Sequence, residues 1–419
     1  MSLSIRNVLL PDGRTASVQV EGNRIADIGN AREADITIDG RGKALLPGLV
    51  NTHTHAAMTL LRGYADDMTL QDWLTTKIWP AEARLTPEAI YWGTKLACLE
   101  MIRSGTTCFN DMYFHMDQAA KAVAEMGIRG ILSEGFIDLS DPARREEEFR
   151  KAREVVRAIE GMRNPRVRPG LGPHAVYTVS RDALLEMRRW ADETHHPIHI
   201  HVSETQGEVE NARKHLGGSP VAYLDKMGLL GPDVIAAHCV WLDDADIQAL
   251  AARNVKVAHC PVSNMKLAVG GAMRLDAMRA AGLTLSLGTD GAASNNALDM
   301  FETMKTTALL HKFASNRATA APAADVFAMA TEGGAKALGL DAGKVEEGKL
   351  ADLVLIDLRT PEMTPAHHLL SNVVYAAPSG SVDTVICDGQ VVMEHRRIRG
   401  EAEILDRASA FASRLAEAA

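Results

Sequence analysis

The chain has 419 residues, of which 46% are hydrophobic and 24% charged, and its net charge at pH 7 is −9. This composition is typical of a soluble globular protein, and the acidic balance and the lack of a long apolar run argue against binding to nucleic acid or a membrane. Because the five cysteines form no CxxC pair, we expect a protein of the reducing cytoplasm, without disulfides or thiolate metal sites.

The two ends of the chain have the pattern of short strands. Residues 3–45 predict strands separated by turns at 11–13 and 21–23, and the segments 351–356, 382–387 and 390–393 are strand-like again. A helix is predicted at about 402–417. The simplest interpretation is that residues 1–45 and 346–419 form one small β-sandwich domain, which the central part of the chain interrupts.

The central part alternates apolar runs with amphipathic segments of helical period. The runs predict eight strands, at 46–53, 106–111, 130–135, 167–173, 198–202, 234–238, 255–259 and 284–288. Helices are predicted at 87–103, 117–127, 145–160, 181–195, 243–253 and about 323–338. Such alternation is typical of parallel α/β proteins, and eight units indicate a closed (β/α)8 TIM barrel over residues 46–345.

His53 and His55 end the first of these strands, after the apolar run 44–50. Side chains two residues apart on a strand point the same way. The pair therefore aims two imidazoles at one spot and predicts half of a metal site.

Other ionisable side chains stand at later strand ends, where TIM barrels carry their chemistry. They are His174, His201 with Glu204 after it, His238, His259 and Asp290. Imidazoles and carboxylates without thiolates suit zinc or a similar divalent metal in a catalytic site. His199 lies one layer deeper than His201 and is expected in the core or in support of the site. The role of His259 stays open, and the remaining histidines are expected to be solvated or structural.

Several segments resemble the metal motifs of the amidohydrolase superfamily: 47–55, 201–205, 237–239 and 288–291. More narrowly, the chain resembles the 5'-methylthioadenosine/S-adenosylhomocysteine deaminases and the related 5'-deoxyadenosine deaminases, in segments 78–82, 104–112, 172–177 and 261–267. The likeness covers nearly the whole length. It implies a small nucleoside substrate and leaves homo-oligomerisation open.

The resemblance implies one divalent metal ion per subunit, zinc in the first place and Fe²⁺ or Mn²⁺ as alternatives. Its ligands would be His53, His55, His201 and Asp290. A single ion is expected because binuclear relatives use a lysine at the end of strand 4, where this chain has His174.

The resemblance also implies the catalytic and substrate-binding residues. Asp290 would take a proton from the attacking water, His238 would hydrogen-bond the reacting centre, and Glu204 would protonate the ring nitrogen and so contact the substrate. Glu82 would accept the ribose hydroxyls, and His174 would bind the purine or the ribose. An apolar cluster lines the 5' side of the pocket or packs a helix: Met68, Leu70, Trp73, Leu74 and Trp79.

One residue departs from the family pattern. Relatives that deaminate S-adenosylhomocysteine well carry an arginine at the end of strand 3, where this chain has Glu134. Arg144 or Arg145, in the following loop, is the alternative cation for the amino-acid carboxylate of that substrate. We therefore expect small 5' groups to be preferred over homocysteine. The alternatives are a deaminase or chlorohydrolase acting on guanine, cytosine or s-triazines, and a barrel that uses its metal structurally.

Overall fold

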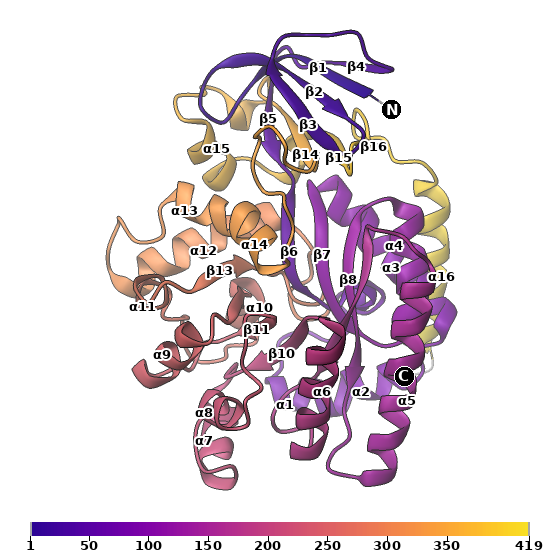
Figure 1. Cartoon of the computed structure of the whole chain (residues 1–419), viewed down its shortest axis with the longest axis vertical. Coiled ribbons are helices and arrows are strands. Elements are labelled where there is room, and N and C mark those ends of the chain that lie inside the picture. The colour runs from indigo at the N-terminus through magenta and orange to yellow at the C-terminus, as the bar shows by residue number, and fades with distance from the viewer. Residues whose placement is uncertain (1, 418–419) are drawn as a thin grey trace.

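Two sheets organise the fold in the computed structural model, which describes residues 2–417 (Figure 1). One is an eight-stranded parallel sheet coiled into a barrel, and the other is a mixed sheet built from both ends of the chain. The predicted TIM barrel with a small β-domain formed by the chain ends is confirmed.

The barrel strands follow one another in chain order, each beside the next. They are β6 (Leu49–Thr54), β7 (Thr106–Tyr113), β8 (Arg129–Phe136), β9 (Val167–Pro173), β10 (Ile198–Val202), β11 (Val234–His238), β12 (Lys256–His259) and β13 (Thr284–Leu287). The first and last strands meet through single hydrogen bonds. The Thr52 hydroxyl donates to the Leu287 carbonyl at 2.9 Å, and the Asp290 amide donates to the His53 carbonyl at 3.0 Å. The second bond ties a predicted metal ligand directly to the strand that carries two others.

Helices cover the outside of the barrel. They are α3 (Pro87–Arg103), α4 (Met116–Met126), α5 (Pro142–Gly161), α6 (Arg181–Thr194), α7 (Gln206–His215), α8 (Pro220–Lys226), α9 (Asp244–Ala252), α10 (Pro261–Lys266), α11 (Leu275–Ala280), α12 (Met300–Ser315), α13 (Ala323–Ala328) and α14 (Gly334–Ala337). Many begin with a side-chain cap, such as Thr86 before α3 and Ser180 before α6. None of the helices in residues 2–417 is long and apolar enough to cross a membrane.

The expected helix over 323–338 is interrupted between α13 and α14 by a wider turn, Met329–Gly333. The cause is close packing on the barrel strands. A Cβ atom on Gly333 would lie 2.3 Å from the Leu285 carbonyl oxygen, and one on Gly334 would lie 2.7 Å from Val50. The two glycines let the segment approach β6 and β13.

The small domain is one connected sheet rather than two separate ones. Its strands are β1 (Ser2–Leu9), β2 (Thr15–Glu21), β3 (Arg24–Gly29), β4 (Ile36–Asp39), β5 (Lys43–Pro47), β14 (Leu353–Asp357), β15 (Val382–Cys387) and β16 (Gln390–Met393). Their order is β16-β15-β14-β5-β1-β2-β3, with β4 beside β1. The antiparallel pair of β5 and β14 joins the two chain ends.

The expected strand 46–53 is in fact divided between the two sheets. Residues 43–47 belong to the mixed sheet, and the barrel strand begins at Leu49. Gly48 separates them, and a Cβ atom there would lie 2.2 Å from the Thr107 hydroxyl. Two further helices belong to the C-terminal part of the chain. The short α15 (Leu369–Tyr375) lies between β14 and β15 in sequence, and the longer α16 (Glu401–Glu417) follows β16 and lies alongside α3 (Figure 1).

A buried ion cluster fixes the mixed sheet to the start of the barrel strands. The Arg129 guanidinium donates to the Asp352 carboxylate at 2.7 Å and to the Asp388 carboxylate at 2.5 Å. The Gly48 amide also donates to the Asp352 carbonyl at 2.8 Å. The mixed sheet therefore covers the amino ends of the barrel strands and leaves their carboxyl ends open (Figure 1).

Candidate active site

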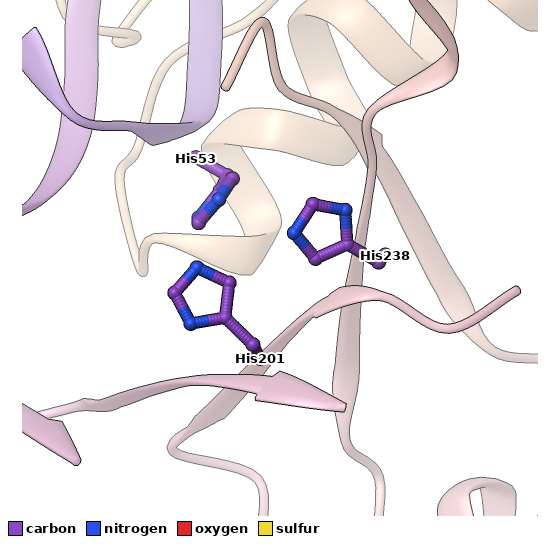
Figure 2. Close-up of side chains that lie close together, drawn as sticks. All are labelled: His53, His201 and His238. Carbon is purple, nitrogen blue, oxygen red and sulfur yellow. The ribbon is translucent and has the colours of Figure 1, made fainter. Parts of the chain in front are cut away.

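The barrel brings most of the predicted site residues together at the carboxyl ends of its strands. Figure 2 shows three imidazoles that point toward one another from different strands: His53 from β6, His201 from β10 and His238 from β11. Asp290, which follows β13, faces the same spot, and all four side chains are buried. The convergence inferred from separate strand ends is therefore present in space.

Four side chains have the spacing of ligands around one ion. The Nε2 atoms of His53 and His55 both lie 3.3 Å from Oδ1 of Asp290. Nε2 of His201 lies 3.3 Å from Nε2 of His55. His238 joins His53 and His201 in a second group whose ligand atoms lie within 4.8 Å of one another.

The donor set fits a divalent cation. Nε2 of His53 is buried and has no hydrogen-bond partner among residues 2–417, so it is available to bind an ion. Three imidazoles and one carboxylate are a borderline set that suits zinc. The residues present thus fit the implied metal.

The backbone orients two of the imidazoles. Nδ1 of His55 lies 2.5 Å from the Met112 carbonyl oxygen, and Nδ1 of His201 lies 2.8 Å from the His174 carbonyl oxygen. A carbonyl only accepts, so each Nδ1 carries the hydrogen and each Nε2 keeps its lone pair for the centre of the site.

Asp290 is held by three donors. Its Oδ2 accepts hydrogen bonds from the Ser263 hydroxyl at 2.6 Å and the Ser294 hydroxyl at 3.1 Å, and its Oδ1 accepts one from the Gly291 amide at 2.8 Å. Burial opposes ionisation, but the contact with His53 outweighs it and holds the pKa of Asp290 well below its usual value. Asp290 is therefore an anion in this site.

Glu204 and His238 face each other beside the metal-binding group. Oε2 of Glu204 lies 3.8 Å from Nε2 of His238. Burial raises the pKa of Glu204. Burial alone would lower the pKa of His238, but the facing carboxylates of Glu204 and Asp290 outweigh it and raise it. Both groups can hold and transfer a proton beside the metal-binding group.

Two residues that the sequence did not indicate position this pair. Glu208 accepts hydrogen bonds from the Ser203 amide at 3.1 Å and the Glu204 amide at 2.8 Å, which fixes the turn after β10. Oδ1 of Asn264 lies 3.0 Å from Nδ1 of His238 and so turns Nε2 of that ring toward Glu204. Asn264 lies in a segment that supports the family resemblance, whereas Glu208 had no such signal.

Glu82 lies in the short helix α2 (Trp79–Glu82), across the pocket from Glu204. The Tyr113 hydroxyl donates a hydrogen bond to Oε1 of Glu82 at 2.8 Å. Burial raises the pKa of Glu82 to about 7, although this hydrogen bond opposes the rise. Its second oxygen remains available to a ligand. Tyr113 is a further site residue that the sequence did not predict.

His174 lies beside His201, with ring centroids 4.8 Å apart. Its Nδ1 lies 2.9 Å from the Thr178 hydroxyl. Burial lowers the pKa of His174 to about 3, so the ring that faces the pocket is neutral.

These groups line one cavity with an empty volume of about 730 Å³. Its polar lining includes Glu82, His174, Glu204, His238 and Asp290, and much of the remaining lining is apolar. Four of the five residues proposed for the 5' side line it, namely Leu70, Trp73, Leu74 and Trp79, and Met68 does not. A cavity with an apolar wall and a few converging polar groups is typical of a small-molecule site.

A sequence model of the Amidohydrolase family matches residues 44–392. The chain belongs to the amidohydrolase family. This amidohydrolase is 52% identical to the 5'-deoxyadenosine deaminase of Methanothermobacter thermautotrophicus, over 97% of this chain and 94% of that protein. It is 50% identical to the 5-methylthioadenosine/S-adenosylhomocysteine deaminase 1 of Archaeoglobus fulgidus, over 97% of each. Among solved structures, a zinc-bound adenosine deaminase from Xanthomonas campestris is similar, with a TM-score of 0.92, 38% identity and coverage of 99% of this chain and 98% of that one.

Glu134, which the resemblance led us to interpret as a departure from the family pattern, has a structural partner in this amidohydrolase. Its carboxylate accepts hydrogen bonds from the His115 amide at 3.1 Å and the Met116 amide at 2.9 Å, at the start of α4. Arg144 lines the hollow next to Glu134, whereas Arg145 forms an exposed ion pair with Asp182 at 3.1 Å. Of the two arginines, only Arg144 lines the hollow beside the cavity.

Replacing Glu134 with glutamine is expected to change how stability depends on pH. Burial raises the pKa of Glu134 from 4.5 to about 7. A carboxyl whose pKa is higher in the folded state binds its proton more tightly there, so the wild type loses stability as pH rises from about 4.5 to about 7. Glutamine does not titrate. It has one acceptor oxygen fewer than the carboxylate, which lowers the free energy of unfolding by an amount that does not depend on pH. Between pH 5 and 8 the variant should gain about 2 to 3 kcal/mol relative to the wild type, measured by guanidinium unfolding of the metal-saturated proteins. An equal pH slope for both proteins would contradict the assignment.

Proposed function

We propose that this amidohydrolase hydrolytically deaminates adenosine derivatives, giving the inosine analogue and ammonia. The candidate substrates are 5'-deoxyadenosine, 5'-methylthioadenosine, S-adenosylhomocysteine and adenosine. The observation that carries the proposal is the cluster of His53, His55, His201 and Asp290, of which only His55 is partly exposed, beside Glu204 in a cavity that Glu82 also lines. The names of the relatives at 50–52% identity support it.

We propose that His53, His55, His201 and Asp290 hold one divalent ion, zinc in the first place. The availability of Nε2 of His53 and the zinc in the similar Xanthomonas structure support this choice. When bound, the ion would lower the pKa of a water to about 7 and so supply a nucleophile at neutral pH.

Asp290 and Glu204 would divide the proton transfers. Asp290 is an anion, so it can accept a proton from the attacking water as the oxygen bonds to the amino-bearing carbon. The raised pKa of Glu204 keeps a proton available for the neighbouring ring nitrogen. The amino group then leaves as ammonia with the proton that Asp290 has taken. The hydroxyl on the same carbon gives its proton to Glu204 and becomes the carbonyl of the product, so both carboxyl groups return to their starting states. His238 would hydrogen-bond the oxygen that adds to this carbon.

Glu82 would select nucleosides over free bases. Its side chain is partly buried and already accepts one hydrogen bond, from Tyr113. Ribose hydroxyls would satisfy its remaining lone pairs, whereas a free base would leave them unpaired in a dry pocket, which costs about 1 to 3 kcal/mol. Guanine, cytosine and s-triazine substrates offer no such donors.

A panel of substrates tests the proposed activity. Ammonia release should be measured with the four adenosine derivatives and with guanine, cytosine and an s-triazine. We expect release from the nucleosides, with the matching inosine analogue identified by mass spectrometry. Release from a free base or triazine alone would contradict the proposal.

The charge near the 5' side predicts a substrate preference. The hollow beside the cavity is lined by more acidic than basic side chains: Glu82, Asp117, Glu134, Glu148 and Glu154 against Arg144 and Lys151. The acidic surroundings disfavour the carboxylate of homocysteine, whereas the apolar wall suits a deoxy or methylthio group. The ratio kcat/KM should therefore be higher for 5'-deoxyadenosine than for S-adenosylhomocysteine. A tenfold advantage for the latter would refute this preference.

A further inference from the structure

His199 is a fully buried histidine that neither the metal ligands nor the substrate contacts account for. It lies in β10, two residues before His201. Its Nε2 lies 2.7 Å from Nδ1 of His53, and the two rings are nearly perpendicular, with an interplanar angle of 88°. Within residues 2–417 this is the only hydrogen bond that His199 makes to another side chain.

The position of the hydrogen in this contact follows from the role of His53. Nε2 of His53 faces Asp290 at 3.3 Å, and it can bind a cation only through its lone pair. A neutral imidazole has one N–H group, so the hydrogen must be on Nδ1. Nδ1 then donates to Nε2 of His199, which must be the acceptor.

His53 differs in this respect from the other two imidazoles of the site. His55 and His201 donate to backbone carbonyls, which no side-chain change removes. The orientation and tautomer of His53 depend instead on a side chain, that of His199. A leucine would fill similar space without the cost of burying a polar ring, so packing alone does not explain an imidazole here.

We propose that His199 is a positioning residue that holds His53 in the orientation and tautomer needed for metal binding. This inference rests on the proposed metal site. Partners of this kind affect metal affinity by about 10- to 100-fold when they are removed. Since the metal site and the chemistry share the ion, retention of the metal is the most direct readout.

The test compares two substitutions at residue 199. H199L removes the acceptor at similar volume, whereas H199Q supplies a carbonyl oxygen near the position of Nε2. Each protein is loaded with zinc, and zinc release to an excess of a chromophoric chelator is followed over time. We expect release from H199L to be about 10- to 100-fold faster than from the wild type, and release from H199Q to stay within a few fold of it.

His259 provides the matched control. It is another buried strand-end histidine, but its Nε2 lies 3.1 Å from Nε2 of His311, which is not a proposed ligand. H259L should release zinc at the wild-type rate, and guanidinium unfolding of the metal-free proteins should show that H199L and H199Q fold equally well.

Three outcomes would overturn the inference. Release from H199L at the wild-type rate would show that the contact does not hold the metal. Equally fast release from H199Q and H199L would assign the effect to the ring's shape rather than to its acceptor. A wild type that binds no zinc would contradict the metal site itself, and ammonia release in the substrate panel would then show separately whether the proposed activity survives.

Discussion

Substitution of Glu204 with glutamine is expected to lower kcat for 5'-deoxyadenosine by about 1,000-fold, within the range found for general acids and bases. Glutamine keeps the shape of the side chain but has no proton to give to the ring nitrogen. The change leaves the four proposed metal ligands in place, so zinc content per chain should equal that of the wild type. The measurement is steady-state ammonia release together with metal analysis of the same preparation.

Glu210 offers a control of the same chemical type. It lies on α7, six residues after Glu204, is exposed and accepts a hydrogen bond from Gln206 at 2.8 Å. E210Q should have wild-type kcat. If E204Q also retained wild-type kcat, the role of Glu204 as the acid would be wrong. If E204Q lost its zinc, Glu204 would have to be regarded as part of the metal site.

Substitution of Asp290 with asparagine is expected to remove both metal retention and activity. Asparagine lacks the negative charge that lies 3.3 Å from His53 and His55, and it cannot take a proton from water. We expect kcat to fall by at least about 1,000-fold and zinc to be released to a chelator at least tenfold faster. Ammonia release in the presence of excess zinc separates the two effects, because saturating metal should not restore the proton acceptor.

Asp276 provides the comparison for Asp290. It is an exposed aspartate on α11 that pairs with Arg317, far from the strand ends. D276N should retain zinc and activity. An active, zinc-retaining D290N protein would contradict both roles proposed for Asp290.

The barrel and the cluster of ionisable residues at its strand ends could be predicted from sequence because their signals are local. Each barrel strand is a short apolar run, and the ionisable residue that ends it is the next residue along the chain, as with His238 at the end of β11. Once eight such units are recognised, the parallel topology brings the strand ends together. Residues at these ends therefore come together in the fold even when many residues separate them in the sequence.

The parts that were missed depend on contacts between distant segments. Tyr113 becomes a site residue only because its hydroxyl reaches Glu82, 31 residues earlier. Glu208 looks like an ordinary helical glutamate, and only the turn after β10 shows that it accepts two backbone hydrogen bonds. The break at Gly48 was not predicted because the apolar residues continue across it, although those before it belong to the mixed sheet and those after it to the barrel.

Glu134 shows how an unusual residue can be read in two ways. In the sequence, Glu134 stands where the resemblance leads us to expect an arginine, and this suggested a preference for substrates with small 5' groups. In the structure it also satisfies the first two amides of α4, His115 and Met116, so it has a structural role whatever the substrate. The substrate preference therefore depends on the whole hollow around Arg144, and not on Glu134 alone.

The central claim is that one divalent ion, held by His53, His55, His201 and Asp290, is required for deamination of an adenosine derivative. Metal-free protein should be titrated with zinc while ammonia release from 5'-deoxyadenosine is measured. We expect no activity without metal, a linear rise on addition, and a plateau at one zinc per chain. Full activity of the metal-free protein, or a plateau at two ions per chain, would contradict the claim.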